Sequence, residues 1–445
     1  MEKPWQSNFK LVYGFFSALF MAFILFAFIM DTPESIFRGL MKINTSRSVL
    51  VTDYIELSGI GAAFMNSALS GLFFLLIAAV ICKRRPDGIL VASLWLTAGF
   101  AFFGKNFINT LPITFGVWLY TKIVKRPFAQ YLTNAMLGAT VGPVVSEIYF
   151  LGEHTSALQI VAGTGIGIGI GLLFPAVTAA VSRVHGGYCL YNSGVSGGLI
   201  TTLCVCILRS ANVTIEPENI WGTSYTVQLA VLCYIIAASL IILGICVDGA
   251  AEVKQKSYKL MNESGRFISD FFTKYRGTSL VNMGALCILA TSLVLGLDIP
   301  INGPVLGGIF TITGFGGMGK HLKNVIPIFL GGVIATFSNH LELDAASNTL
   351  ALLFSTGLAP IAGRFGWQWG VLAGFVHVVI AVFVGQLNGG LNLYNNGFAG
   401  GLVALLIVPV IVTVNGWRKD RAESVKNSAE SHLNDDVDMD EYSHW

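Results

Sequence analysis

The feature that most constrains the fold is a stretch that the chain contains twice. Residues 186–198 and residues 389–401 both follow the pattern GG-x-x-L-Y-N-x-G-x-x-GG, without a gap in either copy. A second pair, residues 99–116 and 314–331, shares Gly-Lys, Asn, Pro-Ile and Gly at identical spacing. Because both pairs occur in the same order along the chain, the sequence predicts two halves with a common architecture.

The composition places both halves in a membrane. The chain has 445 residues, of which 54% are hydrophobic and only 12% are charged, and its mean hydropathy is +0.68. An average soluble domain carries roughly twice that share of charged residues. Helices are the usual way to satisfy backbone hydrogen bonds in lipid, so we expect an all-α polytopic membrane protein. The net charge of +2 gives no indication of nucleic-acid binding, and the seven cysteines match no zinc or redox spacing.

Fourteen apolar runs follow one another along the chain. They lie near residues 11–30, 57–82, 88–104, 106–124, 131–152, 157–182, 187–208, 226–248, 279–297, 303–318, 322–338, 346–363, 367–387 and 390–416. Lysines and arginines gather in alternate connections, whereas the turns between them are neutral or acidic, so the positive-inside rule predicts that both termini are cytoplasmic. Seven segments per half is an odd number, so the second half enters the membrane from the opposite side. The sequence therefore predicts two inverted seven-segment repeats.

The division of the chain follows from the repeat. We expect a first membrane repeat at residues 1–225 and a second at residues 226–417. The charged connector at 248–277 is predicted to form a cytoplasmic amphipathic helix. Residues 418–445 begin basic and end acidic and are predicted to be a disordered cytoplasmic tail.

Segments 3/4 and 10/11 are short. Residues 89–104 and 107–122 hold about 16 apolar residues each, and such a helix rises roughly 24 Å, less than the roughly 30 Å of a bilayer core. Two interpretations stay open: re-entrant hairpins whose Gly-Lys tips stop inside the membrane, or surface turns whose lysines reach water. In the first case the tips and the helix starts that follow them are candidates for solute binding: Lys105, Asn106, Asn109, Lys320 and Asn324.

The duplicated stretch is a second candidate for solute binding. Its polar groups are costly in lipid unless they face partners or a wet cavity. They are Tyr191, Asn192, Asn392, Tyr394, Asn395 and Asn396. The alternative is close helix packing through Gly194-x-x-x-Gly198 and Gly397-x-x-x-Gly401. Both interpretations can hold together, with glycines at a helix contact and asparagines toward a cavity.

Two charged residues, Glu147 and Arg364, occupy equivalent positions in the two halves. They are expected either to form an ion pair between the halves or to lie at the membrane surface. Glu147 is also a candidate to carry a coupling H+ or Na+. No metal or cofactor pattern occurs in the sequence, so none is expected.

The signatures GK-x-x-x-N-x-x-PI and NLYNNGFAGG resemble those of an uncharacterised bacterial membrane-protein family, a domain of unknown function with an internal repeat. This likeness covers nearly the whole chain and implies the fold family but no substrate. Residues 64–71 and the Leu-Tyr-Asn-Ser-Gly element are more weakly similar to elements of urea-transporter-type channels, although the proline of those channels is absent here. Seven-plus-seven inverted repeats also occur in the nucleobase and sulfate/bicarbonate transporter fold, an analogy that rests on segment count alone.

These features favour a membrane transporter of a small polar or anionic solute, with its site at the interface of the repeats. Two lysines and two helix starts favour an anion, whereas the asparagines suit a neutral solute equally well. The alternative is a urea-channel-like passive pore for a small neutral solute. An intramembrane enzyme is disfavoured, because the segments lack acid–base or metal constellations. The expected partners are the solute, the lipid bilayer of the cell membrane and a coupling H+ or Na+, and a homo-oligomer stays an open alternative.

Overall fold

The computed structural model describes residues 4–417 except Leu50, Glu153, His154, Thr214, residues 216–218, Ile268, His340, Leu343 and Asp344. The predicted tail at 418–445 lies outside the described residues. Residues Met1–Ala404 form one compact unit, and Leu405–Trp445 form a second, of which residues 405–417 are described. In the described part of the chain the regular secondary structure is entirely helical, with three isolated β-bridges. The all-α prediction is therefore confirmed.

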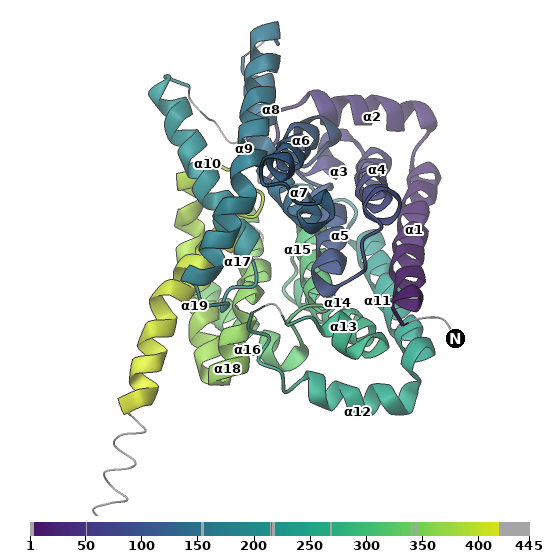
Figure 1. Cartoon of the computed structure of the whole chain (residues 1–445), viewed down its shortest axis with the longest axis vertical. Helices are drawn as coiled ribbons and strands as arrows, with labels where there is room; N and C mark the ends of the chain where they lie inside the picture. The colour runs from purple at the N-terminus through teal and green to yellow at the C-terminus, as the bar shows by residue number, and fades with distance from the viewer. Residues whose placement is uncertain are drawn as a thin grey trace, which may run out of the picture. The chain divides into compact units, whose positions relative to one another are not determined.

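The helices follow the same order in both halves of the chain (Figure 1). In the first half they are α1 (Pro4–Met30), α2 (Pro33–Thr45), α3 (Tyr54–Ser58), α4 (Ile60–Leu76, continued by a π-helical turn), α5 (Gly88–Phe100), α6 (Phe107–Ile123), α7 (Leu132–Gly138), α8 (Pro143–Tyr149), α9 (Ala157–Val184) and α10 (Asn192–Ser210). In the second half they are α11 (Thr226–Asp248), α12 (Ala250–Leu260), α13 (Phe271–Tyr275), α14 (Gly277–Gly296), α15 (Gly303–Phe315), α16 (Leu322–Ser338), α17 (Ala346–Phe354), α18 (Ala359–Phe365), α19 (Trp367–Val384) and a last helix, Asn395–Trp417.

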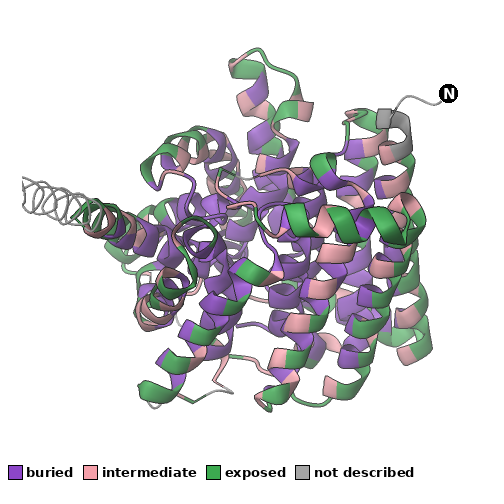
Figure 2. Cartoon of the chain, turned by 90° about the horizontal axis from the view of Figure 1, so that it is seen from below, coloured by how far each residue is buried: buried purple, intermediate pink, exposed green. Residues whose placement is uncertain are grey.

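Eight of the described helices are long and apolar enough to cross a membrane: α1, α4, α9, α10, α11, α14, α19 and Asn395–Trp417. One face of these helices is buried and the other is exposed (Figure 2). The exposed faces carry large apolar side chains, such as Leu25 with 63% and Val227 with 72% of the side chain exposed. Exposed apolar surface on this scale fits contact with lipid rather than water. The chain is therefore a multi-pass membrane protein.

The other six apolar segments are short or broken, three in each half. The helices α5 and α15 have 13 residues, and α6 and α16 have 17. The segments expected near 131–152 and 346–363 are each interrupted by a 3-10 turn, Ala139–Val141 or Ser355–Leu358. A proline stands in the first turn of the next helix in each case, Pro143 as the first residue of α8 and Pro360 as the second of α18, and proline cannot donate the hydrogen bond that would continue the preceding helix.

The short helices α5 and α15 pack against each other in opposite directions (Figure 1). Gly88 at the start of α5 lies against the carbonyl of Gly317, just beyond the end of α15. Gly303 at the start of α15 lies against the carbonyl of Phe102, just beyond the end of α5. Each helix therefore begins where its counterpart ends.

Each of these short helices has an N-cap residue of its own half, and an aspartate from the opposite half also binds its first backbone N–H group. Asp53, just before α3, accepts a hydrogen bond from the backbone N–H of Gly303 (3.1 Å). Asp270, just before α13, accepts one from the backbone N–H of Gly88 (3.0 Å). Asp53 also accepts from the backbone N–H of Gly222 (3.1 Å) and is fully buried. Helix starts leave N–H groups without partners, so these crossed contacts fix the two halves to each other.

The predicted connector at 248–277 contains two helices, α12 and α13, rather than one. Helix α12 is exposed along most of its length, with Val253 and Leu260 buried. The helices of the second half begin with α11 at Thr226, next to the predicted boundary between the repeats. The cytoplasmic position of the connector stays a prediction.

Candidate functional site

Each half forms a tight turn at its Gly-Lys pair, between its 13-residue and 17-residue helices. Gly104 and Gly319 have φ angles of 70° and 88°, in the left-handed region that glycine adopts at least cost. The backbone N–H of the next residue, Lys105 or Lys320, bonds back to the carbonyl of the last residue of the preceding helix. The glycine thereby turns the chain and places the lysine inside the protein.

An asparagine from the preceding long helix holds each turn. The side-chain amide of Asn66 donates hydrogen bonds to the carbonyls of Ala101 (2.7 Å) and Lys105 (3.0 Å). Asn282 makes the same two bonds in the second half, at 2.8 and 2.7 Å. Carbonyls at a helix end have no partner within the helix, so these amides stabilise both turns.

The predicted site residues Asn106, Asn109 and Asn324 cap the helices that follow the turns. Asn106 and Asn109 bond reciprocally to each other's backbone N–H at the start of α6, at 3.0 Å in both directions. His321 and Asn324 form the same arrangement at the start of α16. The amide groups of Asn109 and Asn324 also donate to the carbonyl of the turn glycine, at 2.9 Å. These asparagines therefore position the lysines.

The Lys320 side chain is fully buried. Its ammonium group donates hydrogen bonds to the hydroxyl of Tyr191 and to the hydroxyl of Thr356 (2.8 Å). The ammonium group also lies over the rings of Tyr191 and Phe315, 4.4 and 5.3 Å from their centroids. Sequence reasoning missed Thr356, which lies in the 3-10 turn that interrupts a segment expected to be continuous.

The Lys105 side chain is also fully buried but has different neighbours. Its ammonium group lies 3.4 Å from the Thr97 hydroxyl and 3.2 Å from the Met136 carbonyl oxygen. The ring of Phe74 lies 5.0 Å away. Neither Lys105 nor Lys320 pairs with a carboxylate among the described residues. Neither ammonium group is exposed at the protein surface, and the depth of the two turns in the membrane stays a prediction.

The two copies of the duplicated stretch cross at equivalent glycines. A Cβ atom on Gly194 would lie 2.7 Å from the Cα of Gly397, and one on Gly397 would lie 2.8 Å from the Cα of Gly194. The rings of Tyr191 and Tyr394 meet beside this crossing, with centroids 4.8 Å apart and planes tilted by 43°. The structure therefore brings the two motifs together, and glycine is what permits the contact.

Each copy of the motif also binds the interrupted segment of the opposite half. The backbone N–H of Leu190 donates to the carbonyl of Gly357 (2.9 Å), and that of Leu393 donates to the carbonyl of Thr140 (3.0 Å). The side chain of Leu393 covers the Gly-Lys turn of the first half, because a Cβ on Gly104 would lie 2.2 Å from it. The turns, the interrupted segments and the motifs thus form one buried assembly.

The asparagines of the motif are all buried: Asn192, Asn392, Asn395 and Asn396. Asn192 bonds to the ring of His185 (2.9 Å), and Asn395 accepts from Asn388 (3.1 Å) at the equivalent position of the other copy. The Asn392 side chain accepts from a backbone N–H two residues further on (3.1 Å). These three side chains stabilise the motif itself.

Several polar groups beside the crossing have no hydrogen-bond partner among the described residues. They include the Tyr394 hydroxyl, the Asn396 side-chain oxygen and both ring nitrogens of His377. His377 is fully buried on α19. Unpaired buried polar groups are uncommon in folded proteins, so a solute or water is the natural partner. A lone histidine in an apolar helix gives no sequence signal of a binding role, so the sequence alone does not identify His377.

The predicted ion pair between Glu147 and Arg364 is wrong. Glu147 is buried and accepts hydrogen bonds on both carboxylate oxygens from Arg47, which follows α2 in the same half. Arg364 is exposed at the end of α18. The interrupted segment turns Glu147 toward Arg47 at the end of α2, and no sequence pattern indicates that approach.

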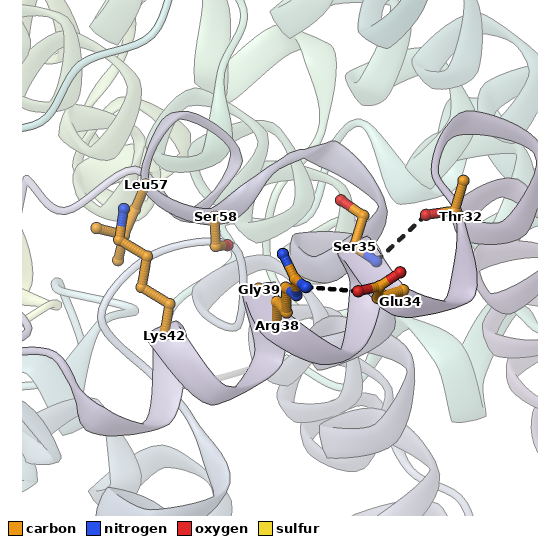
Figure 3. A pocket seen from close by; sticks show the side chains of 8 residues that line it. All are labelled: Thr32, Glu34, Ser35, Arg38, Gly39, Lys42, Leu57 and Ser58. Carbon is orange, nitrogen blue, oxygen red and sulfur yellow. Dashed lines mark hydrogen bonds and ion pairs between the residues drawn. The ribbon is translucent and has the colours of Figure 1, made fainter.

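A surface depression of about 420 Å³ lies beside α2 (Figure 3). Its lining comes from α2 and α3 and includes the exposed ion pair of Glu34 and Arg38 (2.5 Å). None of the predicted site residues lines it. The candidate site is therefore the buried crossing of the two motifs rather than this depression.

The fold and this crossing define a helical multi-pass membrane protein built from two similar halves around two buried lysines. The chain belongs to the family described as "Protein of unknown function (DUF1576)", whose model matches residues 32–210 and 250–413. The two matched regions correspond to the two halves, consistent with an internal repeat, and the predicted family resemblance is confirmed. No curated protein and no solved structure matches the chain.

Proposed function

We propose that this protein is a transporter of a small anion, with the solute site at the buried crossing of two inverted repeats. The observation that carries the proposal is the pair of fully buried lysines, Lys105 and Lys320. Their ammonium groups contact hydroxyls, a carbonyl and aromatic rings, without a carboxylate among the described residues. A buried charge without a counter-charge is costly, and a solute anion would supply that counter-charge.

The antiparallel packing of α5 and α15 supports the inverted arrangement. Equivalent helices that run in opposite directions are expected of halves related by a twofold axis in the membrane plane. Lys83 and Asp298, which precede these helices by the same number of residues, both have left-handed backbone conformations, with φ of 46° and 54°. In such folds one half can adopt the arrangement of the other, and this exchange exposes a central site to each side in turn.

Helix starts at the crossing add to the attraction of an anion. Helix α10 begins at Asn192 and the last helix begins at Asn395, each directly after the tyrosine of its motif. The N-terminus of a helix carries a partial positive charge. The two helix starts therefore favour negative charge at the place where the two tyrosines meet.

A passive pore for a small neutral solute is the second candidate. The unpaired groups of Asn396 and His377 favour it, because an amide and an imidazole can bind a solute that both donates and accepts hydrogen bonds. For both candidate functions we place the protein in the cell membrane, with both termini cytoplasmic, and we propose no enzymatic activity.

Uptake into liposomes tests the proposal. Purified protein is reconstituted, and uptake of radiolabelled formate, acetate and chloride is compared with uptake of urea, with and without gradients of pH or Na+. Anion uptake that depends on Lys105 and Lys320 supports the transporter, and the gradients identify H+ or Na+ as the coupling ion. Uptake of urea alone favours the neutral pore, and no uptake of any anion contradicts the proposal.

A further inference from the structure

The two tyrosines of the duplicated motif occupy equivalent positions but are bonded differently. The Tyr191 hydroxyl accepts a hydrogen bond from Lys320 and lies 3.2 Å from the Thr356 hydroxyl. The Tyr394 hydroxyl is buried and has no hydrogen-bond partner among the described residues. Tyr191 of the first half is therefore bonded to a lysine of the second half, whereas the hydroxyl of its counterpart Tyr394 is unbonded.

The backbone does not explain this difference. The Tyr191 ring lies 5.0 Å from Phe315, which ends the helix before Lys320. The Tyr394 ring lies 5.3 Å from Phe100, which ends the helix before Lys105. Tyr394 has therefore reached the same place beside the first Gly-Lys turn as Tyr191 has beside the second. The difference lies in the lysine side chain and in its partner, because Ala139 stands where the second half has Thr356.

The Lys105 ammonium group has only weak neighbours for a charge. Its contact with the Thr97 hydroxyl is long, at 3.4 Å, and its remaining neighbours are the Met136 carbonyl and the Phe74 ring. A buried hydroxyl without a partner and an ammonium group without a counter-charge are both costly. A single anion that accepts from both groups would remove both costs at once.

We propose that the Tyr394 hydroxyl and the Lys105 ammonium group form the anion-binding half-site of the state described here, and that its ligand is a small monovalent anion such as a carboxylate. This inference rests on the transport function proposed above. A single negative charge matches the one ammonium group of this half-site, since the Lys320 ammonium group is directed to the hydroxyls of Tyr191 and Thr356.

The surroundings of Tyr394 set the size and polarity of the ligand. Its ring packs against Phe100, Tyr191 and Phe354, with centroids 5.3, 4.8 and 5.8 Å away. Rings meet here at steep angles, and aromatic edges carry partial positive charge. Such edges favour a compact anion and leave no further charged partner for a second negative group.

The test compares two variants that each remove one hydroxyl oxygen, Tyr394→Phe and Tyr191→Phe, in the purified full-length protein. Without ligand, Tyr394→Phe should keep or raise the unfolding temperature, because it removes an unpaired hydroxyl. Tyr191→Phe should lower the unfolding temperature, because it removes the partner of Lys320. If both variants change the unfolding temperature by the same amount, the proposed difference between the two half-sites is wrong.

Binding of formate, acetate and chloride is then measured by calorimetry, with urea as the neutral probe. We expect Tyr394→Phe to weaken the binding of the anion that the wild type binds most tightly by about tenfold or more. Tyr191→Phe should weaken that binding less. If Lys105→Ala abolishes anion binding while Tyr394→Phe binds as the wild type does, the half-site is wrong but the transport site stands. If the wild type binds none of the anions, both proposals fail.

Discussion

The ammonium group of Lys320 donates a hydrogen bond to the hydroxyl of Tyr191, which lies 129 positions earlier in the chain and in the opposite half. The equivalent residues, Lys105 and Tyr394, have no such bond. The two halves share their turns, caps and helix order, so the difference lies in side-chain positions. A transporter made of two equivalent halves is expected to show such a difference whenever it is held in one of its two states.

Replacing either buried lysine by alanine should abolish transport of the probe anion while leaving the protein folded. Loss of one charged hydrogen bond is worth about 1.5–3 kcal/mol, which is about ten- to a hundredfold in affinity. Lys323→Ala is the matched control, because Lys323 is exposed one turn after Lys320. Normal uptake by both Lys105→Ala and Lys320→Ala would contradict the assignment.

Alanine at Gly194 should destabilise the crossing of the two motifs. Its Cβ would lie 2.7 Å from the Cα of Gly397 and 2.7 Å from the carbonyl oxygen of Tyr394, so backbone must move. We expect a loss of about 1–3 kcal/mol, measured as a lower unfolding temperature in detergent. Gly165→Ala is the control, because nothing lies within 4 Å of a Cβ there and alanine favours a helix. Equal stability of the two variants would mean that the crossing is looser than described.

Alanine at Asn282 should loosen the Gly-Lys turn of the second half. Two buried carbonyls would lose their donor, at a cost of about 1–3 kcal/mol for each group left unpaired. The expected result is a lower unfolding temperature together with weaker anion uptake. Asn262→Ala removes a hydrogen bond between exposed side chains and should change stability by less than about 0.5 kcal/mol. An Asn282→Ala protein as stable as this control would refute the role of the amide.

Asp53 should make stability depend on pH. Asp53 precedes α3, outside the long apolar helices, and burial raises its pKa from 3.8 to about 6, against three backbone N–H donors that lower it. Between about pH 4 and pH 6 the folded state therefore holds a proton that the unfolded chain has lost. The free energy of unfolding should fall as the pH rises through this range, by on the order of 2 kcal/mol.

Thermal unfolding of the wild type and of Asp53→Asn, measured at half-unit steps from pH 4 to pH 7, checks this dependence. In the asparagine variant the free energy of unfolding should no longer fall with pH in this range. The variant should also be less stable overall, because its amide cannot accept hydrogen bonds from all three N–H groups. Identical slopes for the two proteins would show that Asp53 does not titrate in this range.

The opposite topology that we propose for the two halves predicts that equivalent turns face opposite sides of the membrane. Lys83→Cys and Asp298→Cys, each in a variant that lacks the seven native cysteines, place a thiol at equivalent positions. A membrane-impermeant maleimide applied to intact cells should label the cysteine at 298, and the one at 83 only after lysis. Labelling of both from the same side would rule out inverted repeats.

Sequence patterns predicted the repeat, the helical class and the contacts that depend on residue type alone. The Gly-Lys turns follow from glycine at a left-handed position, and the crossing at Gly194 and Gly397 follows from small residues at helical spacing. Asparagine capping at Asn106 and Asn109 is likewise a local property, although the prediction for these two residues is solute binding. These features need no knowledge of the rest of the fold.

Contacts that depend on tertiary structure could not be predicted in this way. The 3-10 turns look like continuous apolar helix in the sequence, because the N–H groups of Leu190 and Leu393 that bond there come from distant segments. Arg47 reaches Glu147 across 100 positions, and Thr356 meets Lys320 only because its segment is interrupted. A periodic pattern indicates which face of a helix is apolar, but it does not identify the distant group that bonds to that helix.

The crossed aspartates also govern the order of events during synthesis. Helix α5 begins at Gly88, but the aspartate that binds its first backbone N–H group is made 182 residues later. Until Asp270 leaves the ribosome, the backbone N–H of Gly88 at the start of α5 lacks this partner. The first half is therefore an unfinished intermediate for most of translation, and a truncated chain that ends before Asp270 should be recognised and degraded as incomplete.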